Sequence, residues 1–148
     1  MKTLSAEELH QEGVRYYNGE GVNKDVPKAI KCFEQAITLG STKSKRALAS
    51  ILLDDIQIGS SPISIWNAKT DDEKRGVQLY EEAAAEGDEL AKVWFVLQYG
   101  KMLSLFRLLK GEPAKRRYAL AQKYLQEIMN RREAPRKGHP RDQLLPVR

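Results

Sequence analysis

The residues of this 148-residue chain whose side chains most often do chemistry are few and scattered. His10 and His139 are the only histidines, and Cys32 is the only cysteine. A zinc site needs several histidine or cysteine ligands at short spacings, and a nucleophile needs a base beside it. These three residues therefore predict neither a metal site nor a nucleophilic centre. A single cysteine also cannot form a disulfide within the chain.

Acidic residues gather in the middle of the chain, at Asp54, Asp55, Asp71, Asp72 and Glu73. Carboxylates that lie together can bind a hard cation or act as a general acid and base. Asp72 and Glu73, however, follow a threonine in a pattern that starts a helix, and the first turn of a helix favours negative charge. Helix caps explain these residues, so the sequence predicts no enzyme, no metal and no cofactor.

The glycine-rich stretch GEGVNKD, residues 19–25, raises the question of a phosphate-binding loop. Such a loop normally follows a strand and places Lys-Ser or Lys-Thr at the start of a helix, and this stretch has neither feature. Gly19 and Gly21 instead permit positive φ, which lets the chain reverse within a few residues, and Asp25 can cap a following helix. We expect a turn between two helices.

Start and stop signals predict helices along most of the chain. Ser5 and Glu8 form a capping-box pattern, and so do Thr70 and Glu73. No segment alternates polar and apolar residues as a long strand would. The predicted fold class is all-α. The clearest helices run from about Ser5 to the NGEG turn, from Asp25 to Gly40, from Thr70 to Gly87 and from Pro113 to about Arg132.

Two of these helices repeat one another. Residues 25–40, DVPKAIKCFEQAITLG, align without a gap with residues 72–87, DEKRGVQLYEEAAAEG. Phe33 then meets Tyr80, and small and aromatic residues share one helical face. The run GVRYYNGEGVNKDVPKA, residues 13–29, adds a characteristic turn. Together these motifs resemble the Sel-one-like repeat, a branch of the tetratricopeptide-type α/α solenoids.

The resemblance implies a short right-handed α/α solenoid, a tetratricopeptide-like superhelix of about three antiparallel helix pairs. It divides residues 1–132 into repeats at about 5–40, 41–87 and 88–132, and it places Cys32 in the core. The second repeat carries an insertion, residues 54–70, with four isoleucines and Trp66. We expect this insertion either to fold back onto the solenoid or to contact a partner, with Trp66 as the anchor.

The resemblance also implies which residues bind a partner, because the first helix of each pair lines the concave groove of such solenoids. They are Glu7, His10, Val14 and Tyr17 in the first repeat, Lys43, Arg46, Ser50 and Leu53 in the second, and Leu90, Val93, Leu97 and Gly100 in the third. Tyr17, Arg46 and Leu97 are the most strongly expected contacts. The predicted groove changes from polar through basic to apolar, and its apolar end is either open or covered by residues 102–109 or by the tail.

The net charge of +5 is distributed unevenly. Residues 1–106 contain 13 basic and 16 acidic residues, whereas residues 107–148 contain 12 and 4. Only the second part invites nucleic acid, an anionic membrane or an acidic protein. The tail, residues 133–148, is basic and contains three prolines, so we expect it to be extended or disordered. It either stays solvated, binds a partner through its LLPV end, or binds an anionic polymer or membrane.

The start of the chain, MKTLSAEELHQEG, lacks the apolar core of a secretory signal. The most apolar window, residues 90–109, is interrupted by charged side chains. We therefore expect a cytoplasmic protein without membrane insertion, either a monomer or part of a heterocomplex.

Three classes of function remain. The favoured one is a non-enzymatic interaction module that binds one dedicated protein through its concave face and its insertion. The resemblance implies a bacterial immunity protein, or an adaptor or chaperone for a secreted effector toxin. A nucleic-acid-associated regulator that uses the basic C-terminal third is the alternative, with nucleic acid the less expected partner. An enzyme is the third class. Because the same fold can serve different functions, the fold class does not by itself choose among the three.

Overall fold

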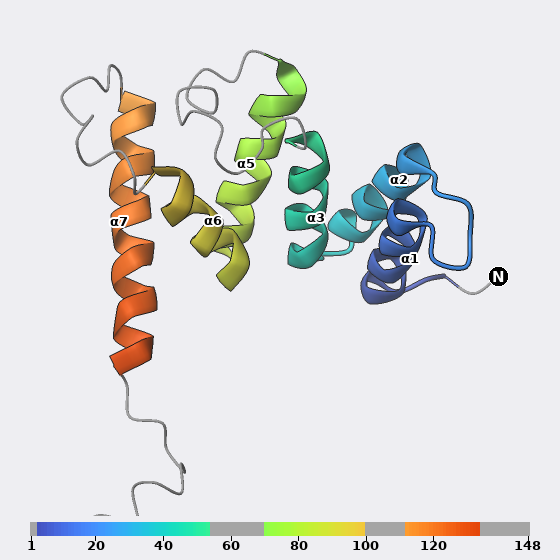
Figure 1. The fold of residues 1–148 in the computed structure, drawn as a ribbon, viewed down its shortest axis with the longest axis horizontal. Coiled ribbons are helices and arrows are strands. Elements are labelled where there is room, and N and C mark those ends of the chain that lie inside the picture. Colours follow the sequence, from blue (N-terminus) through green and yellow to red (C-terminus); the bar gives the residue numbers. More distant parts are fainter. Residues whose placement is uncertain (1–2, 54–69, 100–111, 134–148) are drawn as a thin grey trace, which may run out of the picture.

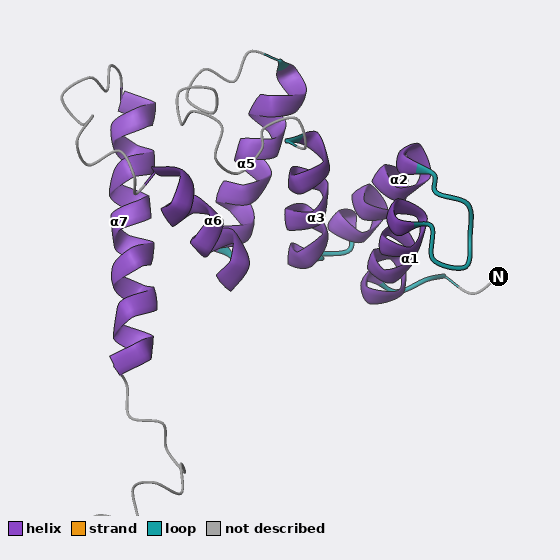
Figure 2. Cartoon of the chain, in the orientation of Figure 1, coloured by secondary structure: helices purple, strands orange, loops and turns teal. Residues whose placement is uncertain are grey.

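The computed structural model describes residues 3–53, 70–99 and 112–133, and all regular structure within these ranges is helical (Figure 2). The helices are α1 (Ala6–Asn18), α2 (Val26–Thr38), α3 (Thr42–Leu52), α5 (Asp71–Ala85), α6 (Glu89–Tyr99) and α7 (Glu112–Glu133). The predicted all-α class is confirmed. The insertion up to residue 69, the segment 102–109 and the tail from residue 134 lie outside the described residues.

Side-chain caps begin the helices at the predicted residues. The Ser5 hydroxyl accepts a hydrogen bond from the Glu8 backbone N–H at 3.2 Å, and the Glu8 carboxylate accepts one from the Ser5 N–H at 2.8 Å. Thr70 and Glu73 form the same reciprocal box at the start of α5. Asp25 caps α2. Each cap satisfies backbone donors that the first helical turn leaves without partners.

The glycine-rich stretch is a turn between α1 and α2, as predicted. Gly19 and Gly21 have φ values of +77° and +70°, which strongly favour glycine. The Asp25 backbone N–H donates a hydrogen bond to the Tyr16 carbonyl at 2.9 Å, which closes the turn over the end of α1. The stretch follows a helix and not the strand that a phosphate-binding loop requires.

Successive helices pack on one another in chain order, which is the arrangement of a helical solenoid (Figure 1). Contacts within the pairs α1–α2, α3–α5 and α6–α7 alternate with the contacts α2–α3 and α5–α6 that join one pair to the next. The pairs follow one another along the long axis, with α1 and α2 at one end and α7 at the other. None of the helices in the described ranges has both the length and the apolar character needed to cross a membrane.

The core is a continuous row of buried side chains that runs through all the pairs. Phe33, Leu48, Val77 and Phe95 come from four different helices, and each is at most 2 % exposed. Tyr124 extends the row into α7. Because each pair covers an apolar face of the next, stability depends on stacking and not on any one pair.

Two glycines let the helices of a pair approach closely. A Cβ atom at Gly13 of α1 would lie 2.7 Å from Cε1 of Phe33 in α2. A Cβ atom at Gly76 of α5 would lie 2.7 Å from Cγ of Leu53, which follows α3. Protein interiors are close-packed, so these two large side chains fill space that only glycine leaves open.

The aligned second helices share their buried positions but begin differently. Phe33 of α2 and Tyr80 of α5 are both buried. Asp25 is the N-cap of α2, whereas the aligned Asp72 lies inside α5 because Thr70 caps that helix two residues earlier. The repeat therefore preserves the packing face more strictly than the residue that starts the helix.

We expect Gly13→Ala to lower the free energy of unfolding by about 1–2 kcal/mol. Overpacking a filled core costs about 1–3 kcal/mol. Alanine has a higher helix propensity than glycine, which offsets at most about 1 kcal/mol of this cost. Chemical denaturation followed by circular dichroism measures the change, with Gln11→Ala on the exposed face of α1 as the control. In a Phe33→Leu background the glycine substitution should cost less, and equal costs in both backgrounds would contradict the packing argument.

Candidate functional site

The residues predicted to bind a partner lie mainly on α1, α3 and α6, the first helices of the three pairs. A groove of about 200 Å³ lies where α1 and α3 meet. It is lined by Val14 and Tyr17 of α1, Phe33 of α2, Arg46, Ala47, Ser50 and Ile51 of α3, and Tyr80 of α5. Four of the predicted residues, Val14, Tyr17, Arg46 and Ser50, therefore meet in one groove.

Arg46 gives the groove its basic character and also connects α3 to α6. Its Nε atom lies 3.1 Å from Oδ1 of Asp88. Asp88 in turn accepts a hydrogen bond from the Ala91 backbone N–H at 2.8 Å, so it caps the start of α6. The Arg46 side chain is still 31 % exposed, so a partner can reach part of it from the groove.

A stacked aromatic pair extends the groove towards α6. The rings of Tyr80 and Trp94 lie with centroids 4.0 Å apart and planes 4° from parallel. Neither residue was predicted at the site, because alignment with Phe33 marks Tyr80 as a core position. Trp94 lies four residues after Leu90, so helical spacing alone places both on the same side of α6.

The inner side of α6 carries a stripe of exposed apolar residues. Leu90, Val93 and Leu97 are 60 %, 38 % and 46 % exposed, and their spacing places them on one helical face beside Trp94. Single exposed leucines are ordinary, but a contiguous apolar group marks an interaction surface. We call the groove, Trp94 and this α6 stripe together the inner surface.

Three further predicted residues, Glu7, His10 and Lys43, make contacts between α1 and α3 but do not line the groove. Nζ of Lys43 lies 3.5 Å from Oε2 of Glu7, and both side chains are more than half exposed. Such a pair contributes little to stability and exchanges readily with charges of a partner. Nδ1 of His10 lies 2.9 Å from Oγ of Ser44, which is fully buried, so His10 joins the two helices.

One predicted contact residue lies in the core and not on the inner surface. Leu53 is 5 % exposed, because it follows the last residue of α3 and its side chain fills the space above Gly76. A partner cannot reach it, which corrects the prediction for this position. Trp66 and Gly100 lie outside the described residues.

Cys32, predicted to be a core thiol, is half-buried on α2 and not fully enclosed. Burial raises the pKa of its thiol, and the Glu12 carboxylate acts in the same direction, so the thiol stays protonated at neutral pH. Asp71, Asp72 and Glu73 occupy the first turn of α5, while Asp54 and Asp55 lie outside the described ranges. No group of three or more metal-binding side chains gathers in the part of the chain that the structure describes.

Comparison with known families agrees with this architecture. The Sel1 repeat model matches residues 13–41, which include the glycine turn and α2, and residues 68–88, which include α5. No curated protein and no solved structure matches the chain. Residues 13–41 and 68–88 are therefore two Sel1-like repeats. Sel1 repeats are protein–protein interaction modules, which supports a binding role for the chain.

The environment of His10 makes stability depend on pH. Burial lowers the pKa of His10; the Glu7 carboxylate opposes this shift, and Lys43 and Arg46 reinforce it. The unfolded chain therefore binds a proton more readily than the folded chain below about pH 6.5, the usual value for histidine. The free energy of unfolding should fall as the pH decreases from about 6.5 through the lower pKa of the folded state.

We expect His10→Gln to flatten this part of the pH profile, because glutamine does not titrate. Denaturant unfolding at closely spaced pH values between 7 and 5 measures the effect. His139→Gln, which removes the other histidine, is the matched control and should retain the dependence. A wild-type pH profile in His10→Gln would contradict the assignment.

Proposed function

We propose that the chain binds one dedicated protein partner through its inner surface, together with the insertion at residues 54–70. The observation that carries the proposal is the continuity of the inner surface, from Tyr17 and Arg46 in the groove, through the Tyr80–Trp94 stack, to the α6 stripe. Tyrosine, tryptophan and arginine are the residues that most often dominate binding energy at protein interfaces.

Within this class, we propose a bacterial immunity protein, or an adaptor or chaperone for a secreted effector toxin, that acts in the cytoplasm. The support is the resemblance to small members of the repeat family, together with the short length of the solenoid. A solenoid with three described helix pairs suits a single partner better than a scaffold that assembles several proteins. The insertion, with Trp66, would add contacts beside the groove.

The charges of α7 favour a protein partner over nucleic acid. Nη2 of Arg116 and Nε of Arg117 lie 2.6 and 3.4 Å from the Glu81 carboxylate. Nη1 of Arg131 lies 2.7 Å from Oε1 of Glu89. The carboxylates beside these arginines lower the positive potential of α7, which weakens salt-dependent binding to nucleic acid.

Affinity purification of the tagged chain from its native host, with nuclease and moderate salt, tests the proposal. We expect one protein in stoichiometric amount, and its identity distinguishes a toxin from other secreted or signalling proteins. Recovery of nucleic acid and ribosomal proteins alone, lost on nuclease treatment, would overturn the proposal in favour of a nucleic-acid-associated regulator.

We expect Leu97→Asp and Tyr17→Ala each to weaken partner binding at least tenfold, because each removes a large contact from the inner surface. Leu39→Asp is the matched control, since Leu39 is 57 % exposed at the end of α2, away from the groove. Titration calorimetry measures affinity, and circular dichroism checks that helicity is unchanged. Equal loss of affinity in Leu39→Asp would show that the inner surface has no special part in binding.

A further inference from the structure

We propose that residues 142–147 of the same chain, DQLLPV, occupy the inner surface and compete with the protein partner. The inference rests on the proposed function, because it assigns an internal competitor to the same surface. It starts from a described feature: α7 ends at Glu133, and fifteen further residues follow it. The position of that end decides which surface the following residues can reach.

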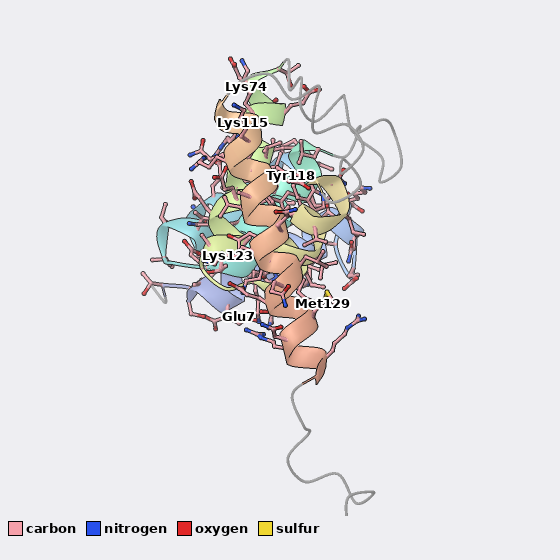
Figure 3. The ribbon with its side chains drawn as sticks, turned by 90° about the vertical axis from the view of Figure 1, so that its left-hand side faces the viewer. Glu7, Lys74, Lys115, Tyr118, Lys123 and Met129 are labelled. Carbon is pink, nitrogen blue, oxygen red and sulfur yellow. The ribbon has the colours of Figure 1, made fainter. Side chains whose placement is uncertain are left out.

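The last turns of α7 lie beside the first turn of α6. Nη1 of Arg131 is 2.7 Å from Oε1 of Glu89, and Nζ of Lys92 is 3.0 Å from Oε2 of Glu127. Figure 3 shows α7 across the end of the solenoid, with Lys115 near its start and Met129 near its end. Because Leu90 follows Glu89 directly, the chain leaves α7 next to the first residue of the α6 stripe.

The groove lies a short distance further on. Arg46 lines the groove and contacts Asp88 at 3.1 Å, two residues before Leu90. The nine residues from Glu133 to Asp142 span up to about 30 Å when extended, at about 3.3 Å per residue. This reach is several times the length of one arginine side chain, and two arginine contacts, Arg131–Glu89 and Arg46–Asp88, link the end of α7 to the groove.

The segment suits the inner surface in its chemistry. Leu144, Leu145 and Val147 are apolar, and a groove of about 200 Å³ admits one such side chain while the α6 stripe accepts others. Asp142 precedes them and supplies a carboxylate for the exposed part of Arg46. Pro146 fixes its own φ and favours an extended backbone at the residue before it, which reduces the entropy lost on docking.

A tether makes even a weak contact matter. Linked segments experience effective concentrations of the order of millimolar, so a site with weak affinity for the free peptide is still largely filled. A partner must then displace the segment. The apparent affinity of the partner falls in proportion to the fraction of chains whose groove is free.

Disulfide trapping in the full chain tests the docking. In a Cys32→Ser background, Ser50→Cys places a thiol in the groove, and Gln143→Cys places one within the segment while sparing its apolar residues. The control pairs Gln143→Cys with Gln78→Cys, since Gln78 is exposed on α5 outside the groove. We expect the groove pair to form its intrachain disulfide at least tenfold faster under mild oxidation, and Leu144→Asp to slow it to the control rate.

Equal rates for the two pairs would overturn the inference, and so would a disulfide between two chains whose rate rises with protein concentration. Partner capture separates this inference from the proposed function. If trapping fails but Leu97→Asp still loses the partner, only the internal competitor is excluded. If Leu97→Asp binds the partner normally, the proposed function itself fails. If the internal competitor and partner binding at the inner surface are both correct, Leu144→Asp should bind the partner more tightly than the unmodified chain.

Discussion

The contact of a large side chain with a glycine on the facing helix holds each of the first two pairs together. Phe33 lies over Gly13 in the first pair, and Leu53 lies over Gly76 in the second. Each contact brings two helices close enough to exclude water from the faces between them. The remaining apolar faces of each pair then have to be covered by the next pair, which produces the stack of helices.

Polar contacts align the helices both within a pair and between pairs, and α3 makes several of them. His10 of α1 contacts Ser44, Nζ of Lys45 lies 3.0 and 2.6 Å from the carboxylates of Glu82 and Glu86 of α5, and Arg46 reaches the cap of α6. The Lys45 side chain is only 15 % exposed, so this pair is less screened by solvent than a surface ion pair. Because α3 also carries the groove residues, the contacts that align the pairs position the inner surface as well.

Because α3 both aligns the helices and lines the groove, few of its residues can change without affecting the packing. Arg46 lines the groove and also contacts Asp88 at the α6 cap, so its replacement would change both the groove and the packing of α6. Leu97 and Val93, in contrast, are exposed and make no described polar contact, so the α6 stripe can change with little effect on the core. Specificity for one partner would therefore arise most readily on α6, while α1 and α3 keep the groove in shape.

Local interactions in the sequence determined much of this protein. Caps at Ser5 and Thr70, and the turn at Gly19, depend on atoms within a few residues of one another, so they could be predicted from the order of residues alone. The shared buried positions Phe33 and Tyr80 followed from helical spacing. These features decided the fold class and most helix ends, whereas the set of helices that carry the inner surface was expected from the resemblance to Sel-one-like repeats.

Only the tertiary structure decided which residues of those helices are exposed. Leu53 has the same spacing as the groove residues, yet it is buried because Gly76, distant in the sequence, leaves space for it. The stack of Tyr80 on Trp94 and the contact of Arg46 with Asp88 likewise join residues on different helices. Helical periodicity gives the direction of a side chain around its own axis, but its contacts depend on how neighbouring helices are placed, and that follows from the packing of the whole stack.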